Sequence, residues 1–227
     1  MIADERRGLI WWGWVGDHLD DIWQRTVEHV QLTAIALVVG CLISFALALL
    51  AVRVRWTYAP IRRVASILYT IPSLALFALL IPFTGLGMVT AEIALVSYTI
   101  LILVSNTVAG LDAVPASVKE AADGMGYTPR RRLLRVELPL ALPTIIAGIR
   151  IASVTVIGLV TVAALIGSGG YGVLIEDGLR RSFPTPIVVG AVLSVTLALL
   201  VDGGLALLQR LLTPWRRAER GGREPAT

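Results

Sequence analysis

Two opposite charges, Arg150 and Asp202, lie inside long stretches of apolar residues. A charged side chain within a membrane span is costly, so it needs a partner, water or access to the surface. Arg150 follows Pro143 by seven residues, and Asp202 precedes Gln209 by seven. At 1.5 Å per helical residue, both charges lie roughly 10 Å from the same membrane surface. The spacing allows an interhelical ion pair, or an Arg150 side chain that snorkels to the interface.

Aromatic, amide and hydroxyl groups also occur inside the apolar stretches. Tyr69 and Tyr98 are candidates to hold a quaternary ammonium ion, because aromatic ring faces attract such cations. Asn106 places an amide on the same stretch as Tyr98. These groups either line a translocation pathway or join helices by hydrogen bonds. We expect no high-affinity solute site among them, since a pathway must release what it binds.

The elements that carry these groups are predicted to be membrane-spanning helices. The 227 residues are 56% hydrophobic and 16% charged, whereas soluble domains are about 45–50% apolar and about 25% charged. A spanning helix needs roughly 20 mostly apolar residues. The predicted fold class is therefore all-α, a polytopic membrane protein. Stretches without Asp, Glu, Lys or Arg predict about five spans, near 32–52, 64–82, 88–110, 143–166 and 186–208.

Prolines and glycines predict where these helices bend or end. Pro72 should kink the second span, and Pro82 should belong to the turn that precedes the third. Pro139 and Pro143 are expected to end a short helix and to start the fourth span. The glycine-rich residues 167–172 predict a tight turn or a re-entrant segment.

The arginines predict the direction of the spans. Fourteen of the 20 basic residues flank the connections after the first and third spans or follow the last span, and five lie on the opposite side. Basic residues prefer the cytoplasmic side of a membrane. The N-terminus is therefore expected outside the cell and the C-terminus in the cytoplasm.

This topology predicts three parts of the chain. Residues 1–31 form an external segment, whose tryptophans favour an amphipathic helix on the bilayer surface over a loose tail. Residues 32–209 form the transmembrane domain, with a cytoplasmic loop at 112–142. Residues 210–227 form a basic cytoplasmic tail.

The loop at 112–142 has the sequence of a helix–glycine–helix element. Ser117 and Glu120 have the spacing of a capping box, and Gly124 and Gly126 should end the first helix. The Thr128-Pro129 pair should begin the second, with threonine as N-cap and proline in the first turn. Such an element at the membrane surface is suited to docking another protein.

Residues within this loop resemble a known family signature. The loop contains Glu120-Ala121-Ala122, three residues, Gly126, nine residues and Val136-x-Leu138-Pro139. This pattern is similar to the EAA signature of bacterial ABC-importer permeases, which has isoleucine where this chain has Val136. The similarity extends over roughly residues 28–205 and looks like the osmoprotectant branch. The segments that carry it are 71–76, 82–87, 106–107, 125–126, 138–143, 148–150 and 166–172.

The resemblance implies a fold, a function and partners. Such permeases have a MetI-like fold, and their loop forms a coupling helix seated on a cytoplasmic ATPase subunit. Glu120, Ala121, Ala122 and Gly126 would form this docking surface. The expected partners are ATPase subunits, a second permease chain, identical or paralogous, an extracytoplasmic binding protein and the lipid bilayer. The solute would be an osmoprotectant such as glycine betaine, carnitine, choline or proline.

Other classes of function find little support in the sequence. Lys119 is the only lysine and follows no glycine-rich loop, so ATP and Mg²⁺ are expected on a partner subunit, with no cofactor and no catalysis in this chain. No cluster of cysteine and histidine predicts a metal site, and His29 is expected at the membrane surface. The arginines form no aromatic-interleaved patch for nucleic acid. The alternatives are import of an amino acid or another small solute, an ion-coupled carrier, and a structural membrane protein.

Overall fold

The computed structural model describes residues 10–214, and the regular elements of this range are all helical. The all-α fold class is therefore confirmed. The four longest helices are α2 (Leu19–Arg53), α5 (Met88–Asp112), α8 (Leu138–Ala163) and α10 (Pro184–Leu212). The shorter ones are α1 (Trp12–Asp17), α3 (Tyr58–Thr70), α4 (Ser73–Thr84), α6 (Ala116–Gly124), α7 (Pro129–Arg132) and α9 (Tyr171–Arg180). Two 3-10 turns, η1 (Arg55–Thr57) and η3 (Ala164–Ile166), and a π-helical turn, η2 (Leu133–Glu137), join them.

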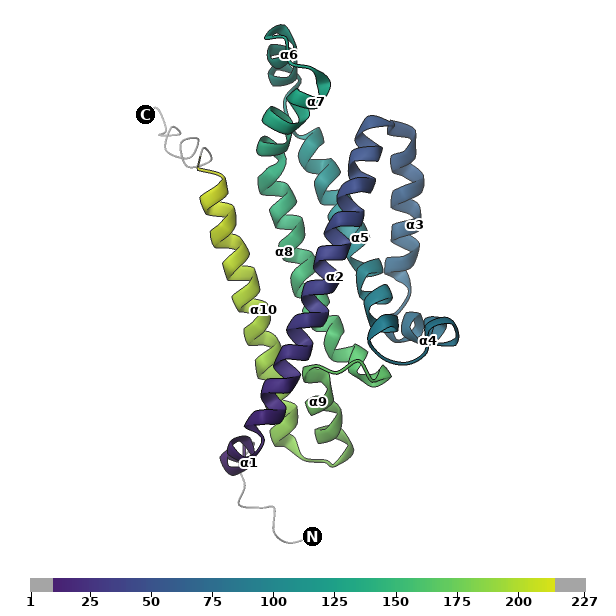
Figure 1. Ribbon diagram of the computed structural model, residues 1–227, viewed down its shortest axis with the longest axis vertical. Coiled ribbons are helices and arrows are strands. Elements are labelled where there is room, and N and C mark those ends of the chain that lie inside the picture. The colour runs from purple at the N-terminus through teal and green to yellow at the C-terminus, as the bar shows by residue number, and fades with distance from the viewer. Residues whose placement is uncertain (1–9, 215–227) are drawn as a thin grey trace, which may run out of the picture.

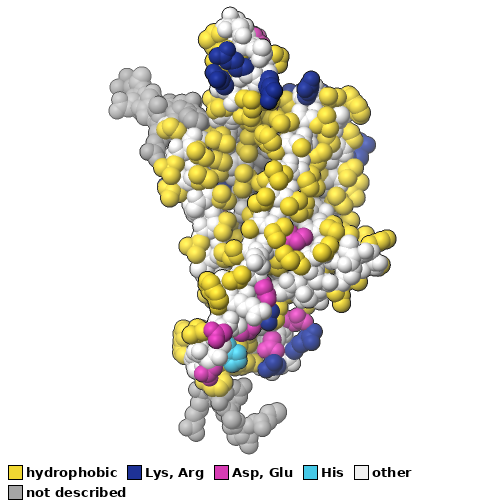
Figure 2. Space-filling model, viewed as in Figure 1, with side chains coloured by type: hydrophobic (Ala, Val, Ile, Leu, Met, Phe, Trp, Pro, Cys, Tyr) yellow, Lys and Arg dark blue, Asp and Glu magenta, His cyan; other side chains and the backbone are white. Residues whose placement is uncertain are grey.

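The long helices lie side by side and form a bundle (Figure 1). Within residues 10–214, four helical stretches are long and apolar enough to cross a membrane, and α3 with α4 makes a fifth if the bent pair is one span. α6 and α7 project beyond the bundle at one end, hereafter the α6 end. α1 and α9 lie at the opposite end, hereafter the α9 end (Figure 1). Charged side chains gather at these two ends, with a broad hydrophobic band between them (Figure 2).

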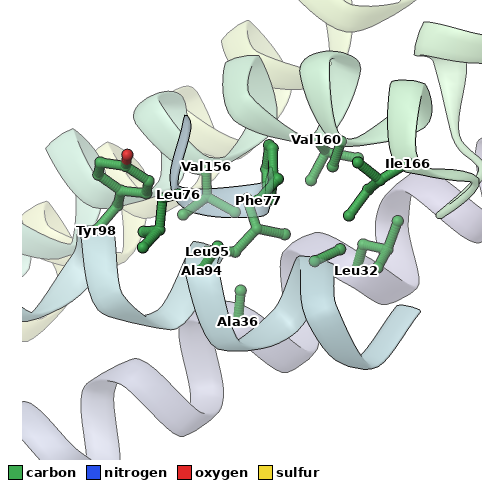
Figure 3. Close-up of a cluster of buried hydrophobic side chains, with 12 residues drawn as sticks. Leu32, Ala36, Leu76, Phe77, Ala94, Leu95, Tyr98, Val156, Val160 and Ile166 are labelled. Carbon is green, nitrogen blue, oxygen red and sulfur yellow. The ribbon is translucent and has the colours of Figure 1, made fainter. Parts of the chain in front are cut away.

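The centre of the bundle is α5, which packs against α2 on one side and α8 on the other. Its buried side chains meet Leu32 of α2, Phe77 of α4 and Val160 of α8 in one hydrophobic cluster (Figure 3). Phe77 and Val160 are completely buried. α4 therefore inserts into the core near the α9 end, although it is too short to cross the bundle.

Small residues let α5 approach both neighbours closely. A Cβ atom added to Gly40 of α2 would stand 2.1 Å from Oγ1 of Thr99, and one added to Gly148 of α8 would stand 2.5 Å from Cβ of Asn106. Lipid is as apolar as the side chains, so helices in a membrane associate through close packing rather than through escape from water. Glycine at these two positions permits that packing.

The second predicted span is broken rather than kinked. α3 ends at Thr70, and α4 leaves it at an angle of 99°. Ile71 is extended, with ψ of 127°, because a residue before proline disfavours the helical region. Pro82 lies inside α4 and not in the turn, which instead forms at Gly85 and Gly87, both with positive φ. Pro82 remains helical because membrane helices tolerate proline in their interior.

The fourth span also differs from its prediction. Pro139 and Pro143 do not separate it from the preceding short helix, because helical structure runs unbroken from Pro129 to Ile166. Pro139 follows the π-helical turn η2 by two residues, and local π-helical adjustment of this kind lets membrane helices accommodate the N–H donor that proline lacks. After the turn of residues 167–170, α9 forms a helix that the sequence did not predict, and it packs against α10.

The predicted boundary at residue 31 falls inside a helix. α2 begins at Leu19, so only α1 is separate from the first span. Residues 1–9 of the predicted external segment lie outside the described range. Of the predicted tail at 210–227, Arg210 belongs to α10, and residues 215–227 lie outside the described range.

Gly148→Ala tests the close approach of α5 and α8. The added methyl group would overlap Asn106, and overpacking of this kind lowers stability by about 1–3 kcal/mol. The matched control is Gly158→Ala on the same helix, where nothing lies within 4 Å of the added atom. We expect the thermal unfolding midpoint in detergent to fall for Gly148→Ala and to stay or rise for Gly158→Ala. Equal midpoints would contradict the packing described.

Candidate coupling site and polar groups of the spans

The segment between α5 and α8 forms the predicted helix–glycine–helix element. α6 ends at Gly124, and Gly126 has φ of 78°, a conformation that glycine adopts without strain. Thr128 caps α7 by accepting a hydrogen bond from the backbone N–H of Arg131, and Pro129 occupies the first turn. The predicted capping box is absent, because α6 starts at Ala116 and places Ser117 inside the helix.

α6 has one buried face and one exposed face. Ala122 is 1% exposed and contacts the rest of the element, whereas Glu120 and Ala121 point to the surface. Among the described residues, Glu120 has no ion-pair partner. Met125, at the end of the helix, is 69% exposed. The signature residues thus divide into Ala122, which is buried, and Glu120 and Ala121, which are available to another protein.

A nearly buried carboxylate, Glu137, lies where this element joins α8. Only 5% of the residue is exposed. Its Oε1 atom accepts a hydrogen bond from Nε of Arg132 at 2.8 Å, and its Oε2 atom lies 3.7 Å from Nζ of Lys119. Arg132 also bonds Asp123, and Lys119 donates to the carbonyl of Leu111 at 3.2 Å. Sequence analysis missed Glu137, although its place just before Leu138-Pro139 in a basic segment was an available signal.

Arg150 and Asp202 form a bidentate ion pair between α8 and α10. The Nε–Oδ1 and Nη2–Oδ2 distances are both 2.7 Å. The parallel geometry suits the planar guanidinium group and gives a strong, directional interaction. About one third of each side chain remains exposed. Nearer the α6 end, the side chain of Gln209 donates a hydrogen bond to the carbonyl of Pro143 at 2.9 Å, so α10 is tied to α8 twice.

Tyr69 and Tyr98 meet, and Asn106 lies apart from them. The two rings pack edge to face with centroids 5.9 Å apart. The hydroxyl of Tyr98 donates to the carbonyl of Ile71, at the break between α3 and α4. Asn106 bonds the carbonyl of Ile102 on its own helix and packs against Gly148. The three residues therefore do not form one site, and Tyr98 satisfies a backbone group that the broken helix exposes.

A cavity of about 480 Å³ opens among α2, α5 and α8. Its walls are apolar apart from Cys41, Ser44 and Thr107. The tyrosines and Asn106 do not line it. Its lining has one aromatic side chain, Phe45, and no charged group, so it offers space beside α5 without the set of aromatic faces that would hold a quaternary ammonium ion tightly.

At the α9 end, α2 holds the glycine-rich turn. His29 is fully buried, stacks on Tyr171 with centroids 4.4 Å apart, and accepts a hydrogen bond from the Tyr171 N–H. The carboxylate of Glu28 accepts one from the N–H of Gly170 at 2.9 Å. The expectation that His29 lies at the surface is wrong, because this turn folds over it. The described residues contain no group of three potential metal ligands.

Comparison with known proteins identifies the chain. The family described as "Binding-protein-dependent transport system inner membrane component" matches residues 36–214. The chain belongs to this family. It is a multi-pass membrane permease. Similar curated proteins include the osmoprotectant import permease protein OsmW of Salmonella typhimurium, 40% identical over 83% of the permease and 90% of OsmW. The choline transport system permease protein OpuBB of Bacillus subtilis is 39% identical, over 84% of the permease and 88% of OpuBB.

Among solved structures, the permease resembles a chain of the MetNI methionine ABC transporter in an inward-facing conformation. The TM-score is 0.75, with 22% identity, over 85% of the permease and 96% of that chain. At this identity the likeness establishes the fold. The resemblance inferred from the EAA spacing is confirmed by the family match and by the relatives.

A double-mutant cycle tests the ion pair inside the spans. Asp202→Asn or Arg150→Gln alone leaves one charge unpaired among apolar helices, so each should lower the thermal midpoint and the yield of folded permease. The Arg150→Gln/Asp202→Asn double variant leaves no charge and should lose less than the sum of the single variants. Additive losses would show that the two side chains do not stabilise each other.

Proposed function

We propose that this permease is the non-catalytic membrane subunit of an ATP-binding-cassette importer, and that α6 docks on a separate ATPase subunit. The observation that carries the proposal is the exposed face of α6, with Glu120 and Ala121, on an element that projects beyond the bundle (Figure 1). The family is described as the inner membrane component of binding-protein-dependent transport systems, and a chain of the same fold belongs to an ABC transporter. Glu120 would pair with a basic or polar group of that partner, and Ala121 would permit close approach.

ATP and Mg²⁺ belong to the partner in this proposal. Lys119, the only lysine in the sequence, is held by Glu137 and by the carbonyl of Leu111, so it is not available to a phosphate. Closure of two ATPase subunits would move α6, and the motion would pass through α7 to α8, which is continuous with it. The spans would then alternate between inward-open and outward-open arrangements.

The proposed orientation places the α6 end in the cytoplasm and the N-terminus outside. Lys119 and the arginines of α7 lie at the α6 end, as do Arg53 and Arg55. Basic residues favour the cytoplasmic side. This orientation exposes α6 to cytoplasmic ATPase subunits and presents α1 and α9 to an extracytoplasmic binding protein.

A second permease chain, identical or paralogous, would complete the pathway. The most apolar part of α10 is left uncovered by the rest of the chain, including Val195 and Leu199, which are 59% and 68% exposed. Lipid can cover these apolar side chains, so they do not by themselves require a second chain. The ion pair of Arg150 and Asp202 suits a protein surface or a water-filled path instead, since exposure of charges to lipid is costly.

The proposed solute is an osmoprotectant such as glycine betaine, carnitine, choline or proline. The support is the identity of about 40% to permeases whose names specify osmoprotectant or choline transport. Import of an amino acid is the alternative, since the same fold occurs in a methionine transporter. An ion-coupled carrier would have no need for the exposed face of α6.

Glu120→Lys tests the docking role. Charge reversal on the exposed face should abolish co-purification of the ATPase subunit and ATP-dependent uptake, while the permease stays folded because Glu120 makes no ion pair within the described residues. Asp20→Lys, the same change on an exposed acid at the α9 end, is the control for co-purification. Co-purification that survives Glu120→Lys would overturn the docking role of Glu120, and uptake that proceeds without an ATPase subunit would point to a carrier.

Solute competition tests the substrate. The permease, its ATPase subunits and its binding protein are reconstituted in proteoliposomes, and uptake of labelled glycine betaine is measured. Excess unlabelled choline, carnitine or proline should reduce this uptake, and methionine should not. Uptake of methionine in preference to glycine betaine would favour the amino-acid alternative.

A further inference from the structure

Few hydrophobic contacts hold α6 against the rest of the protein. Of its nine residues, only Ala122 is buried. The glycine turn at Gly126 follows directly, and the π-helical turn η2 comes after α7. Burial of one alanine stabilises the position of α6 too little to keep it fixed when a partner protein moves it. π-Helical turns are irregular and often occur at functional sites, so η2 adds a second point at which the chain could bend. A flexible joint here would let α6 swing without moving α8.

The ion-pair network of Glu137 spans this joint. Through Lys119 the carboxylate reaches α6, and through Arg132 it reaches α7. Arg132 returns to α6 at Asp123, and Lys119 reaches the end of α5 at Leu111. The contacts therefore form a closed loop around the joint and attach it to both central helices of the bundle. Glu137 is nearly buried between two cations, so moving one cation away would leave a buried charge poorly compensated and would cost free energy.

We propose that Glu137 is a positioning residue that makes α6, α7 and the start of α8 one rigid lever. The inference rests on the proposed docking of α6 to an ATPase subunit. Glu137 does not touch the ATPase, because it is nearly buried beneath α6. It acts through Lys119 and Arg132, and it prevents the motion of α6 from being lost in the glycine and π-helical turns.

The test compares transport per ATP hydrolysed in the full importer, reconstituted with its ATPase subunits and binding protein. Glu137→Gln keeps the shape of the side chain and removes its charge. We expect co-purification with the ATPase to persist and solute transported per ATP to fall about tenfold, within the range typical of coupling between sites. The control is Arg135→Gln, an exposed residue of the same turn without an ion pair in the described part of the chain, and its ratio should match the wild type.

A second variant covers the case in which Glu137→Gln does not assemble. Lys119→Gln leaves Glu137 paired with Arg132 and cuts the direct link to α6. Its transport per ATP should fall by about threefold or more. A ratio within about twofold of wild type in the assembling variant would overturn the inference. Failure of the wild-type permease to bind the ATPase would overturn the proposed function itself, and the two failures are therefore distinct.

A distance measurement separates rigid coupling from general stability. In a Cys41→Ala background, spin labels are placed on Ser117 of α6 and Leu140 of α8, both exposed. In the assembled wild-type importer, the distance between labels should stay the same with and without trapped ATP. With Glu137→Gln the distribution should broaden or shift between the two states. A wild-type distance that changes on ATP trapping would contradict a rigid lever.

Discussion

Close packing of α5 between α2 and α8 is the constraint on which the rest of the permease depends. Lipid is as apolar as these helices, so the hydrophobic effect does not drive their association. Their contact must be stabilised by close van der Waals packing. Glycines at 40 and 148 bring the backbones together, and the apolar cluster around Phe77 and Val160 fills the remaining space. With the centre fixed in this way, the helical stretch from Pro129 to Ile166 extends past the bundle and carries α6 at a defined position (Figure 1).

Three polar contacts inside this packing each hold a feature that helix packing alone would not. The hydroxyl of Tyr98 binds the backbone at the break after α3, and His29 holds the turn before α9. The ion pair of Arg150 and Asp202 ties α10 to α8. Unpaired polar groups are costly in a bilayer, so each interaction also disfavours separation of the elements it joins. These three contacts therefore tie neighbouring elements of the bundle together.

The sequence predicts the features that local composition determines. Apolar stretches identify the spans of α2, α5, α8 and α10, and the spacing from Glu120 to Pro139 identifies the family. A bend at Pro72 was predicted, but not a break of 99°. The burial of His29 and the helix α9 were not predicted, because both depend on contacts between residues distant in sequence. The role of Glu137 is likewise visible only once Lys119 and Arg132 are close to it.

Side-specific transport in proteoliposomes tests the central claim, that the permease uses ATP hydrolysed by a partner at the α6 end. The permease and its ATPase subunits are reconstituted, and solute-loaded binding protein is supplied on the side opposite the ATP. Solute should cross only when ATP is on the α6 side and loaded binding protein is on the α9 side, and ionophores that collapse ion gradients should not stop it. Transport that ionophores abolish and that continues without ATP would contradict the account.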